Sequence, residues 1–256
     1  MWNATTGETA AGPFTEHVDS ILSVAFSPDG KCIVSGSEDK TICVWNTTTG
    51  KIVTGPFIQH TGPVYYVAFS PDGQSIVSGS YDRTICVWNA MTGELVTAPL
   101  TGHTDSVMCV SFSPDGLHIV SSSDDRTIYV WDVITGEKLA GPFTGHTDTV
   151  SSVIFSPDGQ HIVSASYDQT ICVWNTFTEE TGVSLFTGHT DFIRSVAFSS
   201  DGQQIVSGSG DQMIFVWNAM TGKRVAGPFT GHTDEIFSVA FSISKNAKIL
   251  IKLSRA

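Results

Sequence analysis

The chain has 256 residues and a net charge of −12. Such an acidic protein is poorly suited to sequence-independent binding of nucleic acid or of anionic membranes, because both require basic residues. No apolar run approaches the roughly 18 residues of a membrane-spanning helix, and the first residues lack the basic and apolar regions of a signal peptide. We therefore predict no nucleic-acid partner, no membrane partner and an intracellular, cytoplasmic location.

A tryptophan recurs every 43 residues along the chain, at Trp2, Trp45, Trp88, Trp131, Trp174 and Trp217. A histidine keeps the same period from His17 to His232. A unit this short cannot bury its own hydrophobic face, so the period indicates an array of stacked repeats. We interpret residues 1–256 as one array, with full repeats at 17–59, 60–102, 103–145, 146–188 and 189–231 and partial repeats at 1–16 and 232–256.

The repeat at 60–102 illustrates the expected strands. β-Branched and aromatic residues predict a strand at 63–70 and another at 75–80, joined by a Ser-Pro-Asp-Gly turn. A third strand is expected at 84–88, and a shorter, more polar one at 94–99. Four short strands joined by tight turns indicate one antiparallel sheet. Because the second and third strands are apolar on both faces, the sheets are expected to stack around an axis as a β-propeller.

The segments GHTD, SPDG, IVSGS-x-D and TI-x-VWN, at this spacing, resemble the WD40 repeat over essentially the whole chain. The resemblance implies an all-β propeller with four-stranded blades and a role in protein–protein interaction. The near-identity of the copies is similar to the uniform WD40 arrays of fungal proteins, which are often joined to NACHT-type NTPases. The sequence itself contains no G-x-x-x-x-G-K-[ST] phosphate-binding loop.

The regular pattern breaks at both ends of the chain. Residues 1–3 read as the end of a third strand, and residues 8–14 as a fourth. The last repeat starts normally at His232, but Leu250 stands where the recurring serine is expected. We expect five complete four-stranded blades and a defective sixth blade, shared by the two termini at the seam. A piece of a longer array fits the same pattern.

Each full repeat carries a histidine, a serine, an aspartate and a tryptophan at constant offsets. The first three are the residue types of a hydrolase triad. Five identical active sites in one ring are improbable, however, and no nucleophile elbow surrounds the serine. A structural hydrogen-bond chain from Trp through Ser and His to Asp satisfies every polar group, and the resemblance implies this tetrad. The predicted tetrads are His17, Ser35, Asp39 and Trp45; His60, Ser78, Asp82 and Trp88; His103, Ser121, Asp125 and Trp131; His146, Ser164, Asp168 and Trp174; and His189, Ser207, Asp211 and Trp217.

The cysteines are expected to be buried and unpaired. Cys43, Cys86 and Cys172 share one repeat position with Tyr129 and Phe215, so this position accepts any apolar side chain. No Cys/His spacing is typical of a zinc site. We predict no metal, no cofactor and no catalytic residue, because an enzyme would need an unrepeated acid/base cluster.

Three positions per repeat vary while their neighbours stay constant. They are the third and fifth residues after the histidine and the residue before the tetrad aspartate. The resemblance places these positions around the mouth of the central channel, on the top face. Aromatic residues, Met and Arg commonly anchor interfaces. We therefore predict that a protein or peptide partner binds at Leu22, Tyr65, Tyr81, Met108, Tyr167, Phe192, Arg194 and Phe237.

Two more specific functions stay open at this point. The chain could be the recognition array of a NACHT-like receptor, separated from its NTPase. It could also be a phosphopeptide-binding adaptor, which needs several basic residues at the mouth. Among the eight mouth positions only Arg194 is basic. The sequence leaves the partner's identity and the oligomeric state open.

Overall fold

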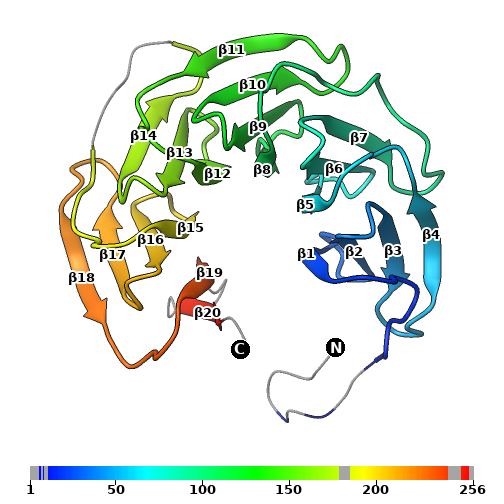
Figure 1. The fold of residues 1–256 in the computed structure, drawn as a ribbon, viewed down its shortest axis with the longest axis horizontal. Coiled ribbons are helices and arrows are strands. Elements are labelled where there is room, and N and C mark those ends of the chain that lie inside the picture. The colour runs from blue at the N-terminus through cyan, green and yellow to red at the C-terminus, as the bar shows by residue number, and fades with distance from the viewer. Residues whose placement is uncertain (1–5, 7, 9–10, 179–184, 242–248, 254–256) are drawn as a thin grey trace.

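The structure is a computed structural model that describes residues 6, 8, 11–178, 185–241 and 249–253. It is all-β, and antiparallel sheets follow one another around a central axis (Figure 1). In each sheet the first strand lies nearest the axis and later strands lie further out. We number these sheets as blades 1 to 6 in chain order. Among the described residues the ring is open between blade 6 and blade 1.

Three blades contain four hydrogen-bonded strands in sequence order, as predicted. Blade 1 consists of β1 (Ile21–Phe26), β2 (Cys32–Ser37), β3 (Ile42–Asn46) and β4 (Ile52–Phe57). Blade 3 consists of β8 (Val107–Phe112), β9 (His118–Ser123), β10 (Ile128–Asp132) and β11 (Lys138–Phe143). Blade 5 consists of β15 (Ile193–Phe198), β16 (Gln204–Ser209), β17 (Ile214–Asn218) and β18 (Arg224–Phe229).

The other blades contain fewer strands among the described residues. Blade 2 consists of β5 (Val64–Phe69), β6 (Ser75–Ser80) and β7 (Ile85–Asn89). Blade 4 consists of β12 (Val150–Phe155), β13 (His161–Ser166) and β14 (Ile171–Asn175). Blade 6 consists of β19 (Ile236–Phe241) and β20 (Ile249–Leu253).

The continuous strand predicted at 94–99 is wrong. This segment of blade 2 forms only isolated bridges, between Leu95 and Trp88 and between Leu100 and Ile85. In blade 1 the corresponding strand passes through Gly55 with a φ of 118°, and a Cβ there would lie 2.8 Å from the Ile42 carbonyl oxygen. The residue at this position in blade 2 is Ala98. Because alanine carries that Cβ and avoids positive φ, the segment cannot follow the same path.

The pairing in blade 6 corrects the expected alignment of the last repeat. Seven residues separate the paired Phe241 and Ile249, whereas six separate the corresponding pair Phe26 and Ile33 in blade 1, so the register shifts by one residue. Ile251 pairs with Val239, as Ser35 pairs with Val24 in blade 1. Ile251, not Leu250, therefore occupies the place of the tetrad serine.

The N-terminal part of the predicted seam is only partly described. Residues 1–3, expected to end a third strand, lie outside the described residues. Of the fourth strand expected at 8–14, the described residues 8 and 11–14 are not in a strand, which corrects that prediction. The Phe14 ring instead packs edge-on against Trp45 of blade 1, with ring centroids 5.3 Å apart.

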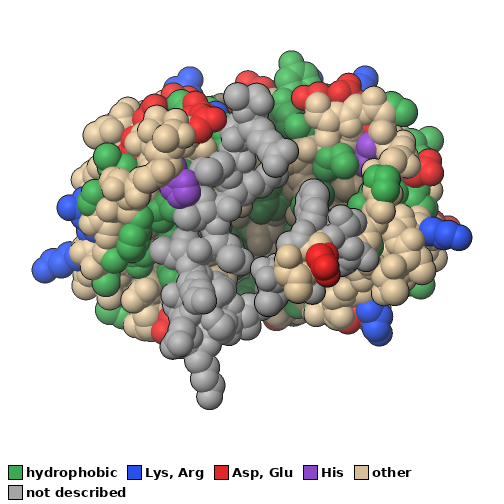
Figure 2. Space-filling model, turned by 90° about the horizontal axis from the view of Figure 1, so that it is seen from below, with side chains coloured by type: hydrophobic (Ala, Val, Ile, Leu, Met, Phe, Trp, Pro, Cys, Tyr) green, Lys and Arg blue, Asp and Glu red, His purple; other side chains and the backbone are tan. Residues whose placement is uncertain are grey.

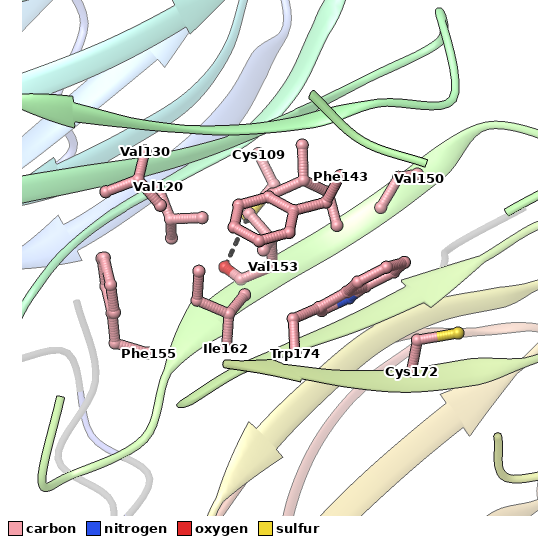
Figure 3. Packing of buried hydrophobic residues seen from close by; sticks show 11 residues of the cluster. Cys109, Val120, Val130, Phe143, Val150, Val153, Phe155, Ile162, Cys172 and Trp174 are labelled. Carbon is pink, nitrogen blue, oxygen red and sulfur yellow. Dashed lines mark hydrogen bonds between the residues drawn. The ribbon is translucent and has the colours of Figure 1, made fainter. Parts of the chain in front are cut away.

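The hydrophobic core lies between neighbouring blades. Figure 3 shows the cluster between blades 3 and 4. In this view Phe143 of β11 lies above Trp174 of β14, and Val153 lies just below the Phe143 ring. Closer to the axis, the second strand of one blade meets the first strand of the next. A Cβ on Gly79 would lie only 2.7 Å from Val107 Cγ1. This position is Gly36, Gly79, Ser122, Ala165 and Gly208 in successive blades.

Replacing Ser122 with alanine is expected to stabilise the protein by about 1 kcal/mol. The Ser122 hydroxyl is buried and has no hydrogen-bond partner. It is the only buried side-chain polar atom in this state within the described residues. Ala165 occupies the same position in blade 4 and is fully buried, so the methyl group fits. Thermal and urea unfolding of S122A and wild type measure the change, and a lower midpoint for S122A contradicts this expectation.

Candidate functional site

The structure brings the four residues of each predicted tetrad together in all five full repeats. In blade 1, Trp45 Nε1 donates to Ser35 Oγ at 2.7 Å, and His17 Nε2 lies 2.7 Å from the same oxygen. His17 Nδ1 lies 2.9 Å from Asp39 Oδ2. The other four tetrads repeat these contacts within about 0.2 Å. Each links the second and third strands of a blade to the loop before its first strand.

One arrangement of protons satisfies every group in this chain. The serine oxygen accepts from the indole N–H and donates its own proton to His Nε2, while His Nδ1–H donates to the carboxylate. The serine oxygen and its proton are thereby both engaged with neighbours. The serine is also buried, with Ser78 and Ser164 fully so. This geometry serves structure, because a nucleophile needs an oxygen that a substrate can reach.

A fifth residue belongs to the network and was missed in the sequence. Thr41 Oγ1 donates to Asp39 Oδ1 at 2.6 Å, and the Thr41 amide donates to the same oxygen at 2.9 Å. Thr84, Thr127 and Thr170 make equivalent contacts in the next three repeats. The signal was present, because a threonine follows the tetrad aspartate by two residues in four of the five full repeats, with Met213 in the fifth.

These contacts hold the aspartates in the ionised form. Burial of Asp39 would by itself raise its pKa, but the hydrogen bonds from Thr41, His17 and the Val18 amide outweigh it and lower the pKa to about 2. The pKa values of Asp82, Asp125 and Asp168 are lowered in the same way. Each carboxylate therefore contributes to stability when it is charged.

Stability is expected to fall as the pH drops from about 4 to about 2. A carboxyl group whose pKa is lower in the folded state stabilises the protein fully above its unfolded pKa, near 4, and loses this contribution as the pH falls through the folded value. For Asp39 this amounts to roughly 2 kcal/mol at about 1.4 kcal/mol per pKa unit. Urea unfolding at a series of pH values measures the loss. An unfolding free energy independent of pH across this window contradicts the expectation.

The variable residues predicted to bind a partner gather at one end of the channel. All six blades contribute to a cavity of about 590 Å³, and five of the eight predicted residues line it: Leu22, Met108, Tyr167, Arg194 and Phe237. The other three, Tyr65, Tyr81 and Phe192, do not line this cavity but contact one another or its lining residues. We call these eight residues the channel mouth.

Arg194 organises one side of the channel mouth. Its guanidinium carbon lies 4.6 Å from the ring centre of Phe192 and 4.4 Å from that of Phe237. Arg194 Nη1 donates to the Tyr167 hydroxyl at 2.8 Å, and Nη2 forms an ion pair with Glu235 at 2.9 Å. These contacts combine residues of blades 4, 5 and 6. They hold a planar cation between aromatic rings, an arrangement that keeps the long side chain fixed.

Tyrosines and carboxylates form the opposite side of the channel mouth. The Tyr65 and Tyr81 rings pack edge to face with centroids 6.2 Å apart, and Tyr81 is 58% exposed. Burial raises the pKa of Tyr65, and the negative charges of Asp124 and Glu38 raise it further. Asp124 also accepts a hydrogen bond from Thr149 at 2.9 Å. This side therefore combines exposed aromatic surface with negative charge.

Other kinds of site receive little support in the part of the chain that the structure describes. No group of three or more His, Cys, Asp or Glu side chains has the arrangement of a metal site there. No helix within the described ranges is long and apolar enough to cross a bilayer. The five cysteines are unpaired, and four of them are buried.

Comparison with known families agrees with this geometry. The family model of the WD domain, G-beta repeat, matches residues 9–46, 51–89, 93–132, 137–175 and 181–218. The chain belongs to the WD40 family. Each match ends at the end of a third strand, where the WD40 repeat places its Trp-Asp or Trp-Asn pair, as in Trp131-Asp132. No curated protein matches the chain. WD40 repeats typically serve as scaffolds for protein interaction and are generally not catalytic.

Proposed function

We propose that this WD40 protein is a non-catalytic interaction module that binds a protein or peptide partner at the channel mouth. The observation that supports the proposal most is the convergence of aromatic side chains, Met108 and Arg194 from several blades on one cavity. These positions vary among the repeats while the tetrad residues and the turn glycines stay the same, as expected of a surface that contacts a ligand. Large aromatic anchors beside a concave surface are the usual centres of binding energy.

The charge of the channel mouth favours a partner with positively charged side chains. Glu38, Asp124 and Glu235 lie at or beside the mouth, and Arg194 is already paired with Glu235. An aromatic surface beside carboxylates attracts Lys or Arg through both cation–π contact and charge. The ion pair with Glu235 argues against a phosphopeptide partner, because Arg194 is the only arginine among the eight channel-mouth residues and its charge is already paired.

The test is a triple variant in which Tyr65, Phe192 and Phe237 are replaced with alanine. We expect it to lose partner capture from cell extract by at least about ten-fold, because each removed anchor contributes on the order of 2 kcal/mol. Quantitative mass spectrometry of captured proteins measures the loss. The melting temperature and circular dichroism spectrum report whether the fold is kept.

A matched control removes apolar side chains from elsewhere on the molecule. Met91, Ile134 and Met220 are 74%, 69% and 83% exposed and lie in the turns after the third strands. Alanine at all three is expected to leave capture unchanged. If the folded mouth variant still captures the wild-type partner set, or if only the control variant loses it, the binding surface lies elsewhere.

Two finer assignments extend this proposal. The near-identity of the repeats supports a role as the recognition array of a NACHT-like receptor, in which the mouth would bind the recognised ligand. The unpaired cysteines support an intracellular, reducing location. Sequencing the transcript that encodes the chain tests the first assignment, and imaging of the tagged protein in its source cell tests the second.

A further inference from the structure

A cavity of about 440 Å³ lies between blades 4 and 5, at the end of the blades opposite to the channel mouth. One of its lining residues, His161, begins β13, and the other end of that strand leads to Tyr167 of the channel mouth. The lining combines apolar with titratable side chains: Val173, Phe198 and Met220, and Asp158, His161 and Asp201. A concave, partly apolar surface with a few polar groups is the usual form of a small-molecule site.

The neighbouring interface, between blades 3 and 4, shows what fits beside a histidine at this position. There Phe177, in the turn after β14, packs edge-on against His118 of blade 3, with ring centroids 5.4 Å apart. Between blades 4 and 5 the corresponding residues, 43 positions later, are Met220 and His161. Met220 is 83% exposed, and His161 is exposed whereas His118 is partly buried. The chain thus places an aromatic ring on one histidine and leaves the next one beside an open cavity.

The charge around this cavity favours a cationic ligand. Asp158 and Asp201 line it, whereas no lysine or arginine does so among the residues that the structure describes. The Ser156 hydroxyl and the Gln160 amide donate to one oxygen of Asp158 and lower the pKa of this carboxyl group, and equivalent bonds lower the pKa of Asp201. Both carboxyl groups are therefore charged at neutral pH. In Figure 2, Asp and Glu side chains gather along the upper edge of the molecule, while Lys and Arg are scattered around its outline. This excess of negative charge concentrates cations near the surface.

We propose that the cavity between blades 4 and 5 binds a small organic cation that carries an aromatic ring. The ring of the ligand lies against His161, as the Phe177 ring lies against His118, and gains the energy of an aromatic contact. The cationic group faces Asp158 and Asp201 and forms charge-assisted hydrogen bonds with them. The channel mouth is at the other end of the blades, so this site goes beyond the proposed partner-binding function and does not depend on it.

The test is a titration of the full chain with benzamidine, an aromatic cation, and with benzamide, its neutral analogue of the same shape. Proton NMR follows the imidazole signals of His161, which are assigned by their loss in His161→Gln. We expect benzamidine to shift these signals in a saturable way with a Kd of about 0.3 mM, an ordinary affinity for a ligand of this size. Benzamide should bind at least about ten-fold more weakly, because it lacks the charge. The signals of His118 should not move, because Phe177 already lies against that ring.

Two variants locate the ligand, and their melting temperatures report that they are folded. Met220→Phe supplies a ring from the chain itself and should weaken benzamidine binding at least about ten-fold, whereas Met91→Phe, at the same repeat position in blade 2, should leave the Kd unchanged. Asparagine at both Asp158 and Asp201 keeps an acceptor oxygen in each turn and should reduce the affinity for benzamidine to that for benzamide.

Three results overturn the proposal. The first is the lack of a saturable shift of the His161 signals up to about 5 mM benzamidine, more than ten times the expected Kd. The second is equal affinity for benzamidine and benzamide, which removes the role of the two carboxylates. The third is unchanged benzamidine binding by folded Met220→Phe, which places the ligand elsewhere on the molecule.

Discussion

Replacing Asp125 with alanine is expected to lower the free energy of unfolding by about 3 kcal/mol, the upper end of the range for an unpaired buried group. The carboxylate accepts hydrogen bonds from His103 and from the Thr127 side chain and amide, and it also accepts from the Thr104 amide. Alanine removes all four acceptor contacts and leaves the histidine ring, whose side chain is 1% exposed, without its carboxylate partner at Nδ1.

Chemical unfolding of D125A measures this loss, and the melting temperature should fall by roughly 6–12 °C. Glu137 provides a matched control in the same blade, because it is exposed and its carboxylate lies in a surface turn. Glu137→Ala should change stability by less than about 0.5 kcal/mol. If D125A and E137A unfold at the same denaturant concentration, the tetrad does not hold the blade together.

Replacing Gly79 with leucine is expected to destabilise the protein by about 3 kcal/mol or more. Gly79 lies in β6 at the interface with blade 3, and a Cβ there would be 2.7 Å from Val107 Cγ1 and 3.1 Å from Val110 Cγ1. Both valines are fully buried, so a larger side chain can be accommodated only by separating the blades.

The repeat supplies a graded control for Gly79→Leu. Ala165 and Ser122 occupy this position in blades 4 and 3, so Gly79→Ala should cost much less, about 1 kcal/mol. Thermal unfolding of the two variants compares the costs. Equal stability of G79A and G79L would show that the interface between blades tolerates a larger side chain.

The repeat made much of this protein predictable from sequence. The strands of blade 2 begin and end within one or two residues of the predicted positions, because β-branched runs and Ser-Pro-Asp-Gly turns are local signals. The tetrad residues could be grouped because His17, Ser35, Asp39 and Trp45 have equivalents at fixed offsets in four further repeats. Local pattern and period together determine which strands pair within a blade.

Features that depend on contacts between blades or between strands could be established only from the tertiary structure. Arg194 and Glu235 are 41 residues apart, and their pairing with Tyr167, Phe192 and Phe237 requires three blades to be placed around one axis. The loss of the regular outer strand in blade 2 follows from the positive φ and the close backbone approach that Gly55 has in blade 1 and that Ala98 cannot adopt, and this geometry is known only from the structure. Val24 of β1 is 59% exposed, which is likewise invisible in the sequence, because its repeat position predicts burial. A repeat determines which surface each blade presents, whereas burial requires a neighbouring blade to be present.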